Sequence, residues 1–155
     1  METLLAVDLG LRAGLALFGR DGRLLRHGSS HFPNRTAVRA AAPGVLAGAG
    51  EIRWLYAEGP QDLARPWLRA ARWRRAEARL VTAEDWRPDL LLPREQRSGE
   101  LAKAHAERLA REVIRWSGLP GPSSLRHDAA EAILMGLWAV RQIGWLESPP
   151  PFLPP

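Results

Sequence analysis

The sequence contains no cysteine, only one lysine and no long apolar segment. Without cysteine, the protein can form neither a disulfide nor a thiolate metal site. No apolar run approaches the ~20 residues that cross a membrane, and the first residues lack the basic and then apolar pattern of a secretory signal. We therefore expect a cytoplasmic protein.

The composition otherwise resembles that of a soluble globular domain. The 155 residues are enough for one domain with a sizeable core, and the hydrophobic share is 46%. The formal net charge is +5, and Lys103 is the one lysine among 22 basic residues. Arginine side chains match phosphate oxygens and stack on bases, which suits a nucleic-acid partner. A GC-rich genome would favour the same composition, so charge alone leaves both explanations open.

The first apolar run of the chain ends on a carboxylate. Residues 4–7 are Leu-Leu-Ala-Val, Asp8 follows, and Gly10 and Gly14 come next. A continuous apolar strand belongs in the middle of a sheet, where both faces are covered. An unpaired charge at its end would be expensive to bury, so such a residue is usually paired, hydrogen-bonded or bound to a metal. We interpret Asp8 as the centre of a site.

A second carboxylate ends a later strand. Residues 52–57 form another largely apolar run, Glu58 follows, and Gly59 stops the strand. A crossover helix between the strands would make this strand parallel to the first. Because ligands bind outside the carboxyl ends of parallel strands, we expect Glu58 to lie beside Asp8 at one edge of the sheet.

The remaining pattern predicts a mixed α/β order of elements. The Asp21-Gly22 pair favours a tight hairpin, which makes the first three strands an antiparallel meander. Polar residues 84–88, ending at a proline, are interpreted as a connection. The tail, 147–155, is proline-rich and is expected to be extended and poorly ordered. The predicted strands are 3–8, 14–18, 23–29, 52–58 and 79–83, and the predicted helices are 35–50 (short or broken), 60–75, 99–116 and 126–143.

The helix predicted over 60–75 carries many arginines. They include Arg65, Arg69 and Arg74, and Trp73 lies among them. Arginines interleaved with an aromatic residue can bind a phosphate backbone. An ordinary solvated helix face has the same composition, and the sequence does not distinguish the two.

The last predicted helix opens with a group of titratable residues. Asp128 and Glu131 are three residues apart and His127 and Glu131 are four apart, so all three share one helix face. Acidic residues in a first turn often only complement the helix dipole. The earlier carboxylates, Asp8 and Glu58, give these positions more weight as part of a site.

Four motifs in this order resemble the RuvC family of Holliday junction resolvases. They are residues 8–10 with Gly14, residues 56–58, residues 127–132, and Trp86-Arg87 followed by residues 99–106, which resembles the short phage-type members. The resemblance covers residues 3 to 142. It implies a ribonuclease H-like fold over 1–146, with a five-stranded mixed sheet of three antiparallel and then two parallel strands flanked by helices, followed by the tail 147–155.

The resemblance also implies a metal site. In this superfamily two divalent cations clamp the attacking water and the leaving oxygen of a phosphodiester. Asp8 would bridge both cations, and Glu58 and Asp128 would complete one coordination sphere each. Glu131 is a fourth candidate ligand, and His127 could take that place or orient water. Mg²⁺ prefers oxygen ligands, so this set suits two Mg²⁺ per active site, with Mn²⁺ as a substitute.

The activity implied is that of a crossover junction endodeoxyribonuclease, a homodimer that resolves four-way and other branched DNA by paired symmetric nicks. Lys103 would contact the scissile phosphate or the junction backbone, although a solvated lysine would look the same. Two other functions stay open: a RuvX-type nuclease that processes ribosomal RNA precursors, and a protein that binds branched DNA without cutting it.

Overall fold

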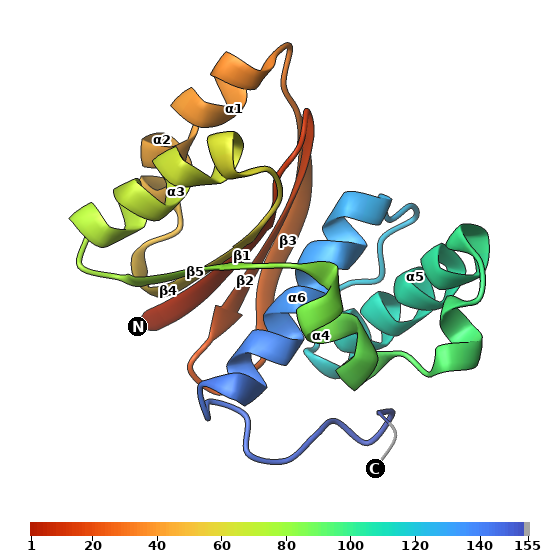
Figure 1. Ribbon diagram of the computed structural model, residues 1–155. Helices are drawn as coiled ribbons and strands as arrows, with labels where there is room; N and C mark the ends of the chain where they lie inside the picture. The colour runs from red at the N-terminus through yellow and green to blue at the C-terminus, as the bar shows by residue number, and fades with distance from the viewer. Residues whose placement is uncertain (154–155) are drawn as a thin grey trace.

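A computed structural model describes residues 1–153 and contains one five-stranded mixed sheet (Figure 1). The strands are β1 (Glu2–Asp8), β2 (Arg12–Gly19), β3 (Leu24–His31), β4 (Glu51–Glu58) and β5 (Glu77–Val81). Their order across the sheet is β3-β2-β1-β4-β5, with antiparallel pairing from β1 to β3 and parallel pairing from β1 through β4 to β5. This confirms the predicted ribonuclease H-like topology.

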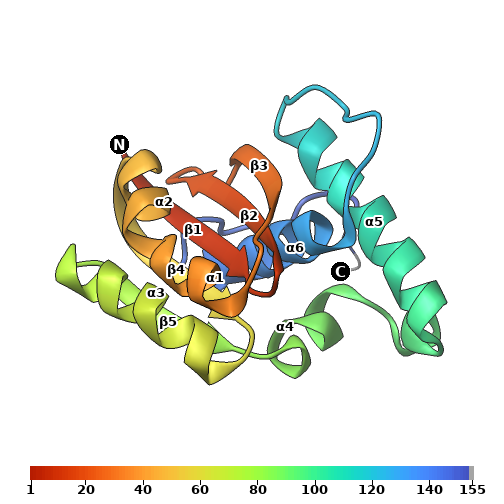
Figure 2. The same ribbon diagram turned by 90° about the horizontal axis from the view of Figure 1, so that it is seen from above.

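Helices cover both faces of the sheet (Figures 1 and 2). One layer is formed by the first three helices, which precede β5, and the other by the last three, which follow it. The helices are α1 (Arg35–Ala40), α2 (Ala42–Gly48), α3 (Gln61–Trp73), α4 (Ala83–Leu90), α5 (Gly99–Trp116) and α6 (His127–Gln142), with a 3-10 turn η1 (Pro93–Gln96) before α5. None of the helices within residues 1–153 combines the length and the apolar character that crossing a membrane requires.

Strand β1 is the centre of two hydrophobic cores. Its side chains alternate between the faces, as strand geometry requires. Leu4 and Ala6 lie in the core under α4 to α6, and Leu5 and Val7 lie in the core under α1 to α3. All four are 3% exposed or less. Both faces are therefore dry, and Asp8 ends a strand that is buried along most of its length.

Small residues let α6 lie close against the sheet. A Cβ atom on Gly136 would come within 2.2 Å of the Phe18 ring on β2. A Cβ atom on Gly14 would come within 1.9 Å of the Asp128 carbonyl oxygen. The start of α6 thus rests directly on β2, which fixes the position of Asp128 in the first turn of the helix.

The connection predicted at residues 84–88 is wrong, because this segment lies within helix α4. Thr82 caps the helix, and its backbone N–H donates to the Asp85 carboxylate at 2.8 Å. Trp86 is fully buried and Leu90 nearly so. Their burial outweighs the one backbone hydrogen bond that Pro88 removes. Strand β5 consequently ends at Val81, two residues before its predicted end.

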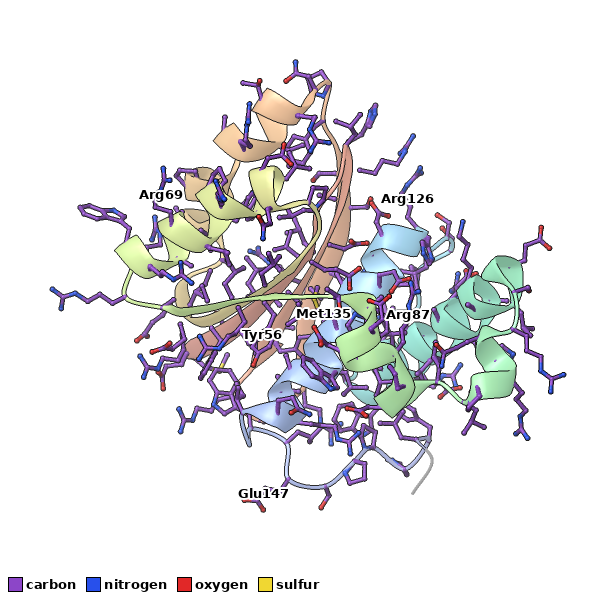
Figure 3. All side chains as sticks on the ribbon, in the orientation of Figure 1. Tyr56, Arg69, Arg87, Arg126, Met135 and Glu147 are labelled. Atoms are coloured by element: carbon purple, nitrogen blue, oxygen red, sulfur yellow. The ribbon has the colours of Figure 1, made fainter. Side chains whose placement is uncertain are left out.

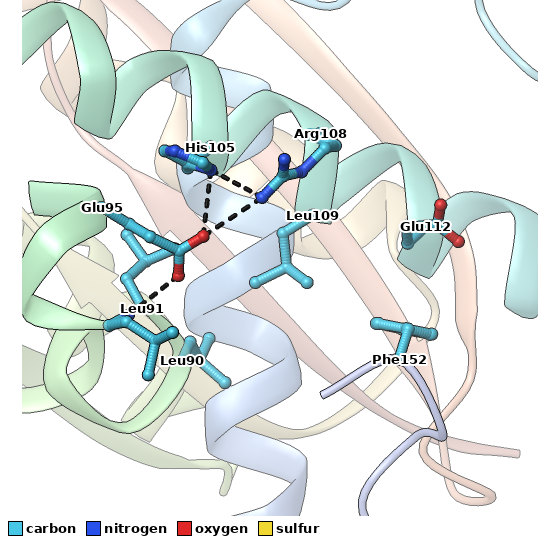
Figure 4. A pocket seen from close by; sticks show the side chains of 9 residues that line it. Leu90, Leu91, Glu95, His105, Arg108, Leu109, Glu112 and Phe152 are labelled. Carbon is cyan, nitrogen blue, oxygen red and sulfur yellow. Dashed lines mark hydrogen bonds and ion pairs between the residues drawn. The ribbon is translucent and has the colours of Figure 1, made fainter. Parts of the chain in front are cut away.

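The tail also differs from its expected extended, poorly ordered form. Leu153 is 7% exposed and donates its backbone N–H to the Pro150 carbonyl at 3.0 Å. Phe152 packs edge-on against Trp116 and lines a hollow of about 340 Å³ beside α5 (Figure 4). Apolar residues between the prolines thus return the tail to the core. Residues 154 and 155 lie outside the described residues, and the domain boundary at 146 stays a prediction.

The close contact of α6 predicts a strong effect of one methyl group. Gly136→Ala should lower the free energy of unfolding by about 1–3 kcal/mol, because the Phe18 ring must move. Gly48→Ala is the matched control, since a Cβ atom there meets nothing within 4 Å. It should leave stability unchanged or raise it by up to about 1 kcal/mol. Urea unfolding measures both, and equal effects would contradict the packing argument.

Candidate functional site

Two parallel strands bring the first two carboxylates side by side. Asp8 and Glu58 are register partners at the ends of β1 and β4. The pairing continues one step further, where the Leu9 N–H donates to the Glu58 carbonyl at 2.8 Å. Gly59 then leaves the strand at φ +142°, where a Cβ atom would lie 2.8 Å from the Leu9 carbonyl oxygen. Glycine at this turn lets the two chains stay together up to the carboxylates.

The start of α6 adds the third carboxylate. Gly14, the antiparallel register partner of Asp8, is the residue on which the Asp128 backbone rests. One Asp128 carboxylate oxygen accepts a hydrogen bond from the Ser29 hydroxyl of β3 at 2.7 Å. Asp8, Glu58 and Asp128 therefore come to one edge of the sheet from three elements far apart in the chain.

Glu131, one turn further along α6, is buried and ion-paired. Its exposure is only 3%. One carboxylate oxygen, Oε1, accepts from the Arg87 guanidinium and lies 3.0 Å from His127 Nε2. The other, Oε2, is buried with no hydrogen-bond partner among residues 1–153. A buried acceptor without a partner is costly, so this oxygen is available to a cation.

Burial, and then like charge, shifts the protonation of the site. Burial, and then the negative charges of Glu58, Glu131 and Asp128, raise the pKa of Asp8 from 3.8 to about 7, while His127 acts in the opposite direction. Burial likewise raises the pKa of Glu58, and the hydrogen bond from Trp86 opposes this shift. Both shifts show that the charged forms of these carboxylates are disfavoured at this edge of the sheet.

The residue types at this edge fit a divalent cation. Asp8, Glu58, Asp128 and Glu131 supply only oxygen donors, which hard cations such as Mg²⁺ prefer. A cation would relieve the repulsion around Asp8 and would give Glu131 Oε2 a partner. Within residues 1–153, no three of these side chains already stand in an arrangement that could hold a metal ion. A cation could be held by three of them only after their side chains rotate.

The two remaining predicted site residues line a neighbouring hollow. Lys103 on α5 and His127 on α6 both border a space of about 400 Å³ between the two helices. Lys103 is exposed, and His127, which borders the same hollow, contacts Glu131. The full lining is Glu100, Lys103, Ala104, Glu107, Leu125 and His127. The structure thus places the lysine near the carboxylates, in contact with solvent.

Comparison with solved structures identifies the fold. The chain matches Thermus thermophilus RuvC in complex with a Holliday junction substrate, with a TM-score of 0.62 and 16% identity over 93% of this chain and 96% of that one. Another structure of T. thermophilus RuvC matches with a TM-score of 0.61 and 15% identity over 92% and 96%. The chain has the fold of RuvC. No family model matches the sequence, and a search of curated proteins finds no match.

On this RuvC fold, helix α4 holds two of the carboxylates. The Trp86 indole N–H donates to Glu58 Oε1 at 2.7 Å, and the next residue, Arg87, pairs with Glu131. Arg87 is labelled on this helix in Figure 3. In the sequence, Trp86 and Arg87 belong to a motif but indicate no role of their own, because the polar residues around them do not indicate the helix that carries them. Ser29 was also missed, and nothing in the sequence of β3 singles it out.

The raised pKa of Asp8 predicts a pH dependence of stability without metal. Between its unfolded value of 3.8 and its folded value of about 7, the folded protein holds a proton that the unfolded chain releases. Stability should therefore fall as pH rises through this range, by about 1.4 kcal/mol for each pH unit in which Asp8 alone differs. Asp8→Asn should flatten the fall in urea unfolding with EDTA. Identical profiles for both proteins would contradict the assignment.

The pairing of Glu131 predicts that Arg87 supports the metal-free fold. Arg87→Met should lower the free energy of unfolding by about 3 kcal/mol, because it leaves a buried carboxylate without its guanidinium. Adding Glu131→Gln should recover most of the loss. Arg115→Met is the control, since its ion pair with Glu112 is exposed and worth at most about 1 kcal/mol. Thermal and urea unfolding would compare these three variants with the wild type. No recovery of stability in the double variant would contradict the pairing.

Proposed function

We propose that this protein is a metal-dependent, structure-selective endodeoxyribonuclease that cuts four-way and other branched DNA by paired symmetric nicks. The observation that carries the proposal is the convergence of Asp8, Glu58 and Asp128 at one edge of a RuvC-fold sheet. Three carboxylates that repel one another lower the stability of the folded protein. The same three carboxylates can hold divalent cations against a phosphodiester.

The carboxylates would hold two Mg²⁺ ions. Asp8, Glu58 and Asp128 would be their main ligands, and Glu131 would be the fourth. When bound, the ions activate a water and stabilise the leaving oxygen of the cleaved strand. Mn²⁺ would substitute, since it accepts the same oxygen donors.

The surrounding residues prepare these ligands. Trp86 occupies one oxygen of Glu58 and thereby orients the other, and Ser29 does the same for Asp128. Arg87 neutralises Glu131 until a cation arrives. Such outer partners fix the orientation of the ligands and are worth about 10- to 100-fold in metal affinity or activity.

Lys103 and His127 would have different roles beside the carboxylates. Lys103 borders the hollow next to the carboxylates, where its ammonium group can reach a phosphate of the bound strand. His127 contacts Glu131, so we assign it to orienting that ligand or a water beside it.

The net charge of +5 favours a polyanionic partner. Paired nicks require two such sites, and we propose that a homodimer supplies them.

Cleavage of a labelled four-way junction tests this function. The substrate would be compared with a linear duplex of the same sequence, with Mg²⁺, with Mn²⁺ and with EDTA. Asp8→Asn should reduce nicking by more than about 100-fold, because even the outer partners of ligands account for about 10- to 100-fold. Glu147→Gln, an exposed carboxylate at the opposite end of the molecule from Arg126, is the control (Figure 3).

The outcomes separate the candidate functions. Symmetric, metal-dependent nicking of the junction that is lost in Asp8→Asn supports a resolvase. Tight binding of the junction without cutting under any of these conditions supports a branched-DNA-binding protein. Cutting of a ribosomal RNA precursor, with the junction neither bound nor cut, supports a RuvX-type nuclease.

A further inference from the structure

A tryptophan on the outer side of α3 is almost completely exposed. The Trp73 side chain is 86% accessible, whereas Trp67, two turns earlier on the same helix, is fully buried. An aromatic ring that stays in water contributes no free energy of burial to the folding of its own chain. Exposed apolar surface of this kind marks an interaction site when it belongs to a larger surface feature.

Trp73 belongs to such a feature. It borders a hollow of about 450 Å³ between α3 and the α1–α2 segment. Pro43 and Pro66 give the hollow rigid apolar walls, and Arg39, Arg69 and Arg74 bring three positive charges to it. We call these six residues the α3 face. The α3 face therefore combines an aromatic platform with several cations around one concave surface.

The protein compensates few of the positive charges of the α3 face. Arg69 and Arg74 form no ion pair within residues 1–153, and the same holds for Arg65 and Arg72 on the exposed side of α3. Arg39 donates to the Thr36 hydroxyl at 3.5 Å and lies close enough to Asp62 to help Arg35 lower the pKa of that carboxyl. The four arginines without an ion pair produce a local positive potential that attracts polyanions.

The α3 face lies away from the carboxylates. Helices α1 to α3 cover one face of the sheet, and α4 to α6 cover the other (Figure 2). In Figure 3, Arg69 lies on the outer side of α3, while Arg87 lies across the sheet at the carboxylate site. A ligand on the α3 face would therefore be bound independently of the cation site.

We propose that the α3 face binds single-stranded DNA. Its arginines would contact successive phosphates, and an unpaired base would stack on the Trp73 indole. Stacking on aromatic rings beside a basic groove is how proteins bind single strands without sequence preference. In a duplex the bases are already stacked on one another, so the indole has no free base face to contact.

The positive charge of the α3 face favours DNA over a second copy of the chain as its binding partner. A two-fold contact through the α3 face would bring two sets of unpaired arginines together, with no acidic residue among the six to separate them. Like charges across an interface oppose association. DNA phosphates would instead neutralise the same arginines and release counterions. The proposal requires no cleavage, so it holds or fails separately from the proposed nuclease activity.

Tryptophan fluorescence provides the test. Full-length protein in EDTA at low salt would be titrated with a short oligothymidylate, which cannot form a duplex. We expect quenching of the exposed indole on binding. Trp73→Leu should abolish this quenching and weaken binding by about 5- to 150-fold, the range for one stacked base. Because Trp73 is exposed, the variant should keep its circular dichroism spectrum and melting temperature.

The arginines are tested by the salt dependence of binding. Arg69→Gln and Arg74→Gln should each weaken binding and reduce the slope of log Kd against log salt by about 0.7. Arg115→Gln, which changes another exposed arginine, on α5 across the sheet, is the control and should leave the slope unchanged.

Three results would overturn the proposal. Unchanged affinity and quenching in Trp73→Leu would exclude stacking at this site. Equal Trp73-dependent quenching by a linear duplex would exclude selectivity for single strands. Sedimentation showing a dimer without DNA that Trp73→Leu dissociates would assign the α3 face to a second copy instead.

Discussion

The burial and mutual repulsion of carboxylates at one edge of the sheet are the constraint on which this structure depends. Asp8 ends a strand that is dry on both faces, and parallel pairing places Glu58 next to it. The start of α6 then adds Asp128 and the buried Glu131. The protein accepts a raised pKa at Asp8 to keep these groups together. Such an arrangement persists only where the surrounding fold is stable enough to enforce it, and two complete cores provide that stability.

Helix α4 moderates the repulsion. Its adjacent residues Trp86 and Arg87 contact two different carboxylates, and Asp89 accepts a hydrogen bond from the Trp138 indole of α6 at 2.8 Å. A short helix thereby holds the end of β4 and the start of α6 at once. The packing of α4 and the orientation of the Glu58 and Glu131 side chains are consequently coupled, so a substitution that changes one should change the other.

The sequence was informative where a hydrophobic pattern was long, or where a charged residue ended an apolar run and would be costly to bury. Apolar runs ending on Asp8 and Glu58 predicted both the central strands and their adjacency, and the helical spacing after Asp128 predicted α6. Helix α4 was missed because Pro88 and its polar neighbours look like a loop, while the burial that stabilises it depends on distant residues. Ser29 could not be found, since its role arises only from a contact made 99 residues away. The prolines of the tail likewise concealed Phe152, whose partner Trp116 belongs to another helix.

The contact between Gly14 and the Asp128 backbone has a consequence for biosynthesis. The hairpin that carries Asp8 is made long before α6, the helix that completes the site. A nascent chain that ends before α6 contains Asp8 and Glu58 but lacks Asp128 and Glu131. The complete carboxylate set therefore forms only after α6 has been made, and translation products that stop before α6 would lack it.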